Sequence, residues 1–332
     1  MPKNLAEQVL KTVKNYDMIK SNDAILAAVS GGPDSVFLLH ILGRLRGKLK
    51  IKDIVVANLD HGLRGKESRV DSLFVKKASE ALGFKFIHKR VNLKRSGASK
   101  ISTEERAREE RYKFFREAAQ ASGANVIATG HTLDDQAETV LMRFIKGASL
   151  KGIVGISPAR DEAGVRLIRP LIELQKDEIV KYLDAASIGC RIDSSNAEPI
   201  YFRNVVRNQI IPYLEQYNPK LKRALFSLAE HLREDFEFIE AEKSKLKNCI
   251  PDIQKGSLDM RLKDIAVQPK ALQKEILRDA LNKAGGEVKR LSFRHWKELE
   301  YFIKYKRNGD AIDLPGGIRV KRSETSLSFY KL

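Results

Sequence analysis

A short apolar run that ends in two glycines constrains the fold of this chain more than any other feature. Residues 24–29 (Ala-Ile-Leu-Ala-Ala-Val) predict a buried strand, and Ser30-Gly31-Gly32-Pro33-Asp34-Ser35 follows at once. Glycine lets the backbone turn tightly and approach a ligand closely, and proline suits the first turn of a helix. The free N–H groups of a helix start favour an anion, so we expect a turn that binds phosphate.

The composition of this turn separates it from the common phosphate-binding loops. No Gly-x-x-x-x-Gly-Lys-Ser/Thr sequence is present, and no lysine lies in the turn. Asp34 is there instead, and a carboxylate beside phosphates indicates a Mg²⁺ ligand. The alternative is a plain helix start with an acidic residue in its first turn, which the complete strand–turn–helix context disfavours.

Strands and helices alternate along the first half of the chain. The expected strands are residues 24–29, 54–59, 84–91, 125–129 and 166–171, and the expected helices between them are 36–45, 67–82, 104–121 and 134–146. Such alternation predicts an α/β fold with a mainly parallel sheet covered on both faces.

The pattern becomes mainly helical after about residue 190. Helices are expected over residues 199–217, 220–247, 271–284 and 291–306, and a small β-hairpin over 311–330 around Pro315-Gly316-Gly317. We therefore expect an α/β domain over residues 1–215 and a smaller, mainly helical domain with a terminal hairpin over residues 216–332.

The net charge of +18 on 332 residues indicates a polyanionic partner such as a nucleic acid. The two cysteines, Cys190 and Cys249, match no metal motif and indicate reduced thiols in a cytoplasmic protein. No apolar stretch is long enough to span a membrane, and no secretory leader is expected.

Polar side chains follow two further strands at the same edge of the expected sheet. His61 and Arg64 follow the second strand, where α/β sheets bind ligands; the alternative is a basic loop capped by the next helix. Asp135 and Glu138 share a helix face after the fourth strand and could hold Mg²⁺ or an ammonium group. The alternative there is helix capping, with Thr132 as the N-cap.

Two arginines on the expected helix 104–121 suit anion binding. Arg108 and Arg111 lie three positions apart on one face and could neutralise phosphates or a leaving pyrophosphate. From periodicity alone, a surface helix with a Glu104–Arg108 ion pair is the better interpretation.

The Ser-Gly-Gly-x-Asp-Ser turn resembles the signature of the PP-loop, or N-type ATP pyrophosphatase, family. The resemblance implies cleavage of ATP between the α- and β-phosphates and transfer of AMP to a substrate oxygen. It implies ATP and Mg²⁺ as the nucleotide and the metal.

In order along residues 24–217, the further segments resemble the tRNA(Ile)-lysidine synthetases. They are His61-x-Leu-Arg, a Glu-x-x-Ala-Arg-x-x-Arg-Tyr helix, His131-x-x-Asp-Asp-x-x-Glu-Thr, Arg169-Pro-Leu, Asp193-x-x-Asn and Arg203-Asn-x-x-Arg. One departure is Ser149, where the family has a glycine, and the chain resembles a short form of the family. The resemblance implies that residues 1–215 form the catalytic domain and residues 216–332 the substrate-binding domain.

This second resemblance implies a reaction and its substrates. The wobble cytidine of tRNA(Ile) with a CAU anticodon is adenylated at its C2 oxygen, and the ε-amine of L-lysine then displaces AMP. The oligomeric state stays open, with a homodimer as one option.

The resemblance also implies a role for each matching residue. Asp34 and Asp135 would bind metal, Arg111 would stabilise charge during transfer, and Asp135 and Glu138 would bind lysine; only the family pattern favours Asp135 over Asp134 as the essential acid. The expected ATP contacts are Ser30, Gly31, Gly32, Pro33, Asp34, Ser35, His61, Arg64, Arg108 and His131. The expected tRNA contacts are Arg203, Arg207, Lys304, Lys306 and Arg307.

Three other functions fit parts of the sequence. A PP-loop tRNA thiolation enzyme would need cysteines, and two scattered cysteines argue against it. The basic surplus argues against a small-molecule amide synthetase, and the intact acidic and basic set argues against a non-catalytic RNA-binding protein.

Overall fold

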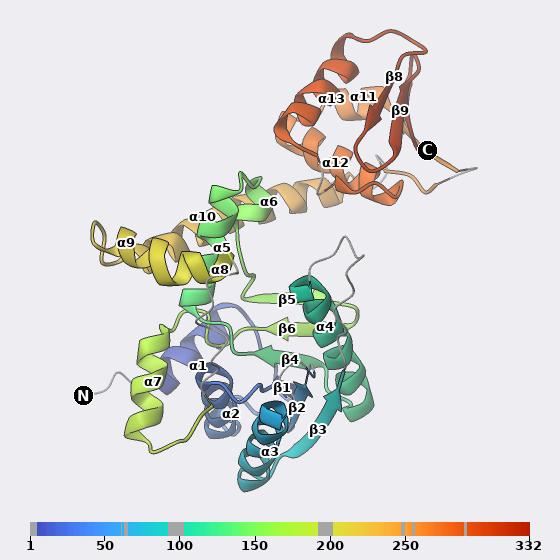
Figure 1. Cartoon of the computed structure of the whole chain (residues 1–332). Coiled ribbons are helices and arrows are strands. Elements are labelled where there is room, and N and C mark those ends of the chain that lie inside the picture. Colours follow the sequence, from blue (N-terminus) through green and yellow to red (C-terminus); the bar gives the residue numbers. More distant parts are fainter. Residues whose placement is uncertain are drawn as a thin grey trace. The chain divides into compact units, whose positions relative to one another are not determined.

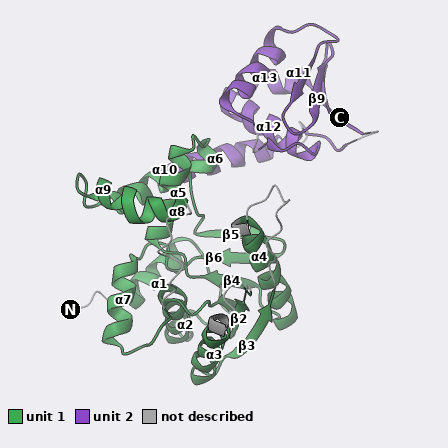
Figure 2. Cartoon of the chain, in the orientation of Figure 1, with its two compact units in different colours: residues 1–230 green, residues 231–332 purple. Residues whose placement is uncertain are grey.

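A computed structural model of the chain describes residues 5–60, 62, 66–91, 103–191, 202–246, 250–253, 256–288 and 291–332, without the side chains of residues 66–68, 103 and 104. The chain divides into two compact units, residues 1–230 and 231–332 (Figure 2). The division falls inside helix α10 (Leu221–Lys245), whereas the boundary expected from the sequence coincides with the end of α9 (Ile211–Glu215).

The first unit is built on a six-stranded sheet in the order β3-β2-β1-β4-β6-β5 (Figure 1). All neighbouring pairs are parallel except β5 and β6. The strands are β1 Ala24–Ala28, β2 Asp53–Asp60, β3 Lys85–Arg90, β4 Val126–Thr129, β5 Ala159–Glu162 and β6 Val165–Ile168. The predicted parallel α/β fold is confirmed, and the antiparallel edge strand β5 is an addition to it.

Helices cover both faces of this sheet: α1 Leu5–Asn15, α2 Pro33–Leu45, α3 Lys66–Ala81 and α7 Lys176–Ala185 on one face, and α4 Thr103–Ser122 on the other. The other helices of the unit are α5 Leu133–Ile145, α6 Leu150–Ile153, α8 Phe202–Val205, the π-helix Val206–Ile210 and α9, and α5, α8, the π-helix and α9 share a hydrophobic cluster of their own. Within β1, Ile25 and Ala27 pack in the core with α1, α2 and α7, whereas Leu26 and Ala28 pack against α4. Because successive strand residues face opposite sides, this alternation shows a strand buried on both faces.

The order of the strands places the site. The chain builds outward from β1 through β2 to β3, then returns to β4 on the other side of β1. Open α/β sheets bind ligands at the carboxyl ends of the strands where the order reverses in this way. The carboxyl ends of β1 and β4 are therefore where ligand binding is expected, and α2 and α5 begin there.

The second unit has its own sheet and core. Its four antiparallel strands follow the order β7-β10-β9-β8, and Trp296, Leu299 and Phe329 are buried between sheet and helices. The elements are β7 Ser257–Arg261, α11 Leu262–Ala266, α12 Lys270–Lys283, α13 Phe293–Tyr305, β8 Ala311–Leu314, β9 Ile318–Arg322 and β10 Ser326–Lys331. The predicted terminal hairpin is the β8–β9 pair, and it is one part of this larger sheet.

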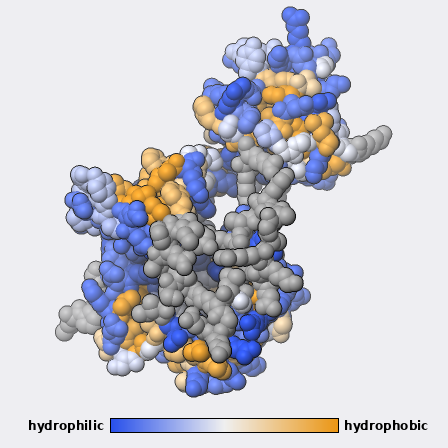
Figure 3. Space-filling model, viewed as in Figure 1, coloured by the Kyte–Doolittle hydropathy of each residue, from blue (hydrophilic) through white to orange (hydrophobic). Residues whose placement is uncertain are grey.

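The surface of the second unit mixes hydrophobic and hydrophilic side chains (Figure 3). Large exposed side chains on α13 include Phe293, Tyr301 and Tyr305. In the part of the chain that the structure covers, no helix is both long and apolar enough to cross a membrane.

Candidate active site

The turn after β1 forms the structure expected of a phosphate-binding turn. Helix α2 begins at Pro33 with Gly32 as its N-cap, and Gly31 has φ +99°, a conformation that favours glycine. The Ser35 hydroxyl oxygen accepts hydrogen bonds from the backbone N–H groups of Ser30 (3.2 Å) and Gly31 (3.1 Å) and donates to the Gly32 carbonyl (2.9 Å). Ser35 thus fixes the turn, and the amides of the first helical turn remain available for an anion.

Gly130, at the end of β4, brings a second loop against this turn. A Cβ atom there would lie 3.1 Å from the Asp34 backbone carbon and oxygen and 3.2 Å from the Ser35 nitrogen. No side chain fits in that space without moving the backbone. The two strand ends therefore meet in direct backbone contact.

Asp34 is mostly buried, and one of its oxygens has no protein partner. Oδ2 lies 3.2 Å from Lys176 Nζ, whereas Oδ1 is buried without a hydrogen bond among the described residues. Burial raises the pKa of Asp34 to about 6. The positive charge of Lys176 acts to lower this pKa, and the negative charge of Asp135 acts to raise it further. A mostly buried carboxylate with one unsatisfied oxygen and a raised pKa, beside a phosphate turn, is typical of a ligand-binding site.

Mg²⁺ fits this site. Hard oxygen ligands suit Mg²⁺, which is commonly held by one or two carboxylates together with substrate phosphates. Asp34 Oδ1 supplies an oxygen of that kind, and no group of three metal-binding side chains forms within the described part of the chain. The protein would hold the metal jointly with the nucleotide.

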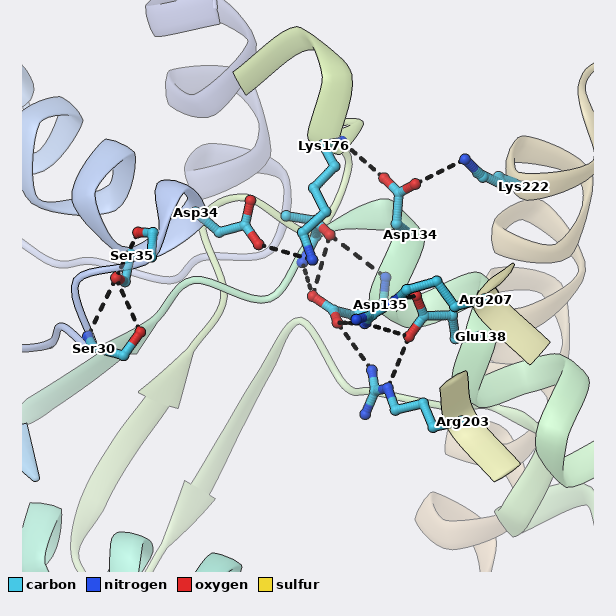
Figure 4. Close-up of polar contacts among 12 residues, drawn as sticks. Ser30, Asp34, Ser35, Asp134, Asp135, Glu138, Lys176, Arg203, Arg207 and Lys222 are labelled. Atoms are coloured by element: carbon cyan, nitrogen blue, oxygen red, sulfur yellow. Dashed lines mark hydrogen bonds and ion pairs between the residues drawn. The ribbon is translucent and has the colours of Figure 1, made fainter. Parts of the chain in front are cut away.

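Asp134 and Asp135 have different partners (Figure 4). Asp134 accepts a hydrogen bond from the backbone N–H of Lys176 (2.8 Å) and forms an ion pair with Lys222 Nζ (2.9 Å). Asp135 forms a capping box with Thr132: its Oδ2 accepts from Thr132 N (3.0 Å), while its own N–H donates to Thr132 Oγ1 (3.4 Å). The capping interpretation is therefore correct for Asp135, and it leaves Asp135 Oδ1 for other contacts.

Two arginines occupy the acidic pair Asp135 and Glu138. Arg203 donates to Glu138 Oε2 (2.7 Å) and to Asp135 Oδ1 (2.9 Å), and Arg207 donates to both oxygens of Glu138 (2.5 and 2.9 Å) (Figure 4). Arg203 lies in α8 and Arg207 in the π-helix that follows directly, so two consecutive helical segments bring both arginines to the Glu138 carboxylate. Burial acts to raise the pKa of Asp135, but Arg203 and His131 outweigh it and lower the pKa to about 2.

His131 lies next to these acids as a neutral imidazole. Burial lowers its pKa to about 3, although Asp135 acts to raise it. Its Nδ1 lies 2.9 Å from Thr129 Oγ1. At neutral pH the ring is therefore a hydrogen-bonding group and not a cation.

The predicted arginines of α4 lie on exposed positions. The guanidinium of Arg108 lies 5.1 Å from the Tyr112 ring centroid, and it is one of the charges that lower the pKa of His131. Arg111 is exposed one turn further along α4. Their roles toward ATP stay predictions, as do the tRNA roles of Arg203 and Arg207.

Several other predicted residues lie in the second unit or outside the described residues. His61 and Arg64 lie outside the described residues, as does the Asp193 segment. Lys304, Lys306 and Arg307 are exposed at the end of α13 in the second unit. The sequence did not predict a role for Lys176, because no signal near it in the chain indicates its contact with Asp34.

A comparison with protein-family models identifies the class of this chain. Residues 1–214 match the PP-loop domain model, which covers the first sheet, the phosphate turn and the acidic pair. The chain belongs to the PP-loop family.

The most similar relatives include two curated proteins named tRNA(Ile)-lysidine synthase. The protein of Clostridioides difficile is 34% identical over 97% of this chain and 69% of its own length. The protein of Clostridium perfringens is 38% identical over 95% of this chain and 66% of its own length. Within the PP-loop family, the chain is a member of the tRNA(Ile)-lysidine synthases, and it spans about two thirds of the length of these two relatives.

A solved structure supports the fold alone. The U34-tRNA thiolase NcsA from Methanococcus maripaludis, with its [4Fe-4S] cluster, has a TM-score of 0.58 and 20% identity, covering 69% of this chain and 78% of that one. At this identity, the similarity shows a shared PP-loop fold and nothing about the reaction. The thiolation alternative therefore gains no support from it.

Proposed function

We propose that this chain is an ATP-dependent ligase that converts the wobble cytidine of tRNA(Ile) with a CAU anticodon to lysidine. In the first step, the C2 oxygen of cytidine attacks the α-phosphorus of ATP, and pyrophosphate leaves. In the second, the ε-amine of L-lysine attacks C2, the C2–O bond breaks, AMP leaves, and the nitrogen loses a proton. A tRNA-modifying enzyme works where tRNA is, so we place it in the cytoplasm.

One observation supports this proposal above the others: a phosphate turn and an acidic pair lie at neighbouring strand ends. The turn suits the polyanionic nucleotide, and the acidic pair suits a cationic amine. In the structure that pair forms ion pairs with Arg203 and Arg207, and a substrate ammonium would take the place of some of these contacts. A substrate amino acid with a side-chain ammonium matches this arrangement.

In the proposed reaction, acidic residues bind the cations and basic residues bind the phosphates. Asp34 would hold Mg²⁺, which neutralises phosphate charge when bound, and the amides after Gly32 would orient the phosphates. Arg108 and Arg111 on α4 would stabilise the charge that develops as pyrophosphate leaves. Asp135 and Glu138 would receive the lysine ammonium. Lys304, Lys306 and Arg307, at and just after the end of α13, would contact the tRNA backbone.

Incorporation of radiolabelled L-lysine into an unmodified tRNA(Ile) transcript tests the proposal. We expect labelling that requires ATP and that is lost when the wobble cytidine is replaced by uridine. AMP and pyrophosphate should form in amounts equal to the incorporated lysine. Pyrophosphate release with tRNA but no lysine incorporation would overturn the proposed nucleophile and retain the PP-loop chemistry.

A further inference from the structure

The phosphate turn contains no lysine, but a lysine from a distant part of the chain reaches it. Lys176 is the first residue of α7, and its Nζ lies 3.2 Å from Asp34 Oδ2 (Figure 4). About one third of its side chain is exposed, whereas 17% of Asp34 is exposed. The ammonium group is thus held at the mouth of the turn, on the side where solvent has access.

The base of Lys176 is fixed by the second strand-end loop. Its backbone N–H donates to Asp134 Oδ2 (2.8 Å), and Leu133 N–H donates to the Leu174 carbonyl (2.9 Å). A capping box of Gln175 and Glu178 defines the start of α7. Because the backbone is held at three points, the flexible part of Lys176 is its side chain.

The contact with Asp34 satisfies only half of that carboxylate. Oδ2 has the lysine, and Oδ1 is buried without a partner among the described residues. A carboxylate that binds Mg²⁺ has less need of an ammonium counter-ion, since both cations neutralise the same charge. The lysine would then be free to turn toward phosphate oxygens, to which an ammonium group donates strongly.

We propose that Lys176 is the phosphate-binding cation of this turn, and that its ammonium moves from Asp34 to the β- and γ-phosphates of the bound nucleotide. It takes the place of the lysine that ordinary P-loops have within the loop itself. Its contacts go to the part of ATP that leaves as pyrophosphate. The inference rests on the proposed function, because it requires ATP at this turn.

Binding of ATP and AMP to Lys176→Met at pH 8 tests the inference, measured by calorimetry with Mg²⁺ present. ATP and AMP differ by the β- and γ-phosphates, so the ratio of their affinities isolates contacts to those groups. Loss of a charge-assisted hydrogen bond lowers affinity by about 10- to 100-fold. We expect that loss for ATP, a change below about threefold for AMP, and substantial recovery in Lys176→Arg.

Two further variants separate phosphate binding from a purely structural ion pair. Lys181→Met removes an exposed lysine from the same helix and should leave both affinities unchanged. In an Asp34→Asn background, Lys176 has no carboxylate partner in the turn. If it binds phosphate, Lys176→Met still weakens ATP binding in that background; if it is only a counter-ion, the substitution has no further effect.

The outcomes are distinct. An unchanged ATP affinity in Lys176→Met, or an equal loss for ATP and AMP, would overturn the inference while the wild type still binds ATP. A wild type that binds no ATP would instead overturn the proposed function, and this inference with it. Thermal unfolding of each variant shows whether a loss of binding reflects a loss of folded protein.

Discussion

Replacing Asp34 with asparagine is expected to stabilise the protein at neutral and alkaline pH. The pKa of Asp34 is raised from 3.8 to about 6, so the folded chain binds more protons than the unfolded chain between these values. Stability therefore falls as pH rises from about 4 to about 6, and the deficit stays constant above that range. A pKa unit corresponds to ~1.4 kcal/mol, so the ionised carboxylate costs about 3 kcal/mol.

This cost of the ionised Asp34 carboxylate already includes the attraction of Lys176, because that attraction opposes the effect of burial on the pKa of Asp34. We expect a net gain of about 1–3 kcal/mol at pH 8, falling to roughly half at pH 5. Urea denaturation of wild type and variant across pH 5 to 8 measures the difference, and Asp184→Asn, which removes an exposed carboxylate of α7, serves as the control. The variant should have lost activity, as expected when a destabilising group is kept for function.

The reasoning fails if Asp34→Asn is no more stable than the wild type at pH 8. It also fails if a gain is present but does not change between pH 5 and pH 8. The first result would mean that the pair with Lys176 outweighs the cost of burial. The second would mean that the gain comes from packing and not from charge.

Further predictions concern the contact between the two strand ends, the start of α5 and the basic surface. Gly130→Ala should weaken ATP binding at least tenfold, because its Cβ would press on the Asp34 backbone, whereas Gly47→Ala, which meets nothing within 4 Å, should not; nucleotide titration compares them. Thr132→Ala should lower the free energy of unfolding by about 1 kcal/mol through loss of the capping box, measured by urea denaturation. For tRNA binding, the slope of log Kd against log salt should fall by about 1 for each phosphate-contacting cation removed, measured with alanine at Lys304, Lys306 and Arg307.

Local signals in the sequence accounted for the architecture of the first unit. The turn from Ser30 to Ser35 and the alternation of strands and helices are features of neighbouring residues, and parallel strands place their carboxyl ends at one edge by geometry. That is why the sequence predicted the phosphate turn and the acidic pair at the same edge. The edge strand β5 (Ala-Arg-Asp-Glu) has three charged residues and no apolar run, so the sequence does not predict it as a strand. Strand β7 alternates buried and exposed residues over only five positions, and the sequence indicates a loop at its start.

Long-range pairing could not be predicted in the same way. Nothing near Lys176 in the sequence indicates Asp34, which lies far earlier in the chain, and the contact depends on where α7 packs against α2. The same holds for Glu138 with Arg203 and Arg207, which the sequence suggested only as basic residues near tRNA. Adjacent acids at Asp134 and Asp135 likewise differ only in the direction that helix geometry gives each side chain.

Under the proposed function, an amine that binds at Glu138 must displace arginine contacts that are already formed. Both carboxylates already have nitrogen donors, so an incoming amine gains only the difference between its own contacts and those that it displaces. A ligand whose chain is too short to place its ammonium correctly would release an arginine and leave a buried charge unpaired. The free energy lost by leaving that charge unpaired would then exclude diamino acids shorter than lysine. Lysine itself would bind with only modest affinity, because its contacts replace existing ones.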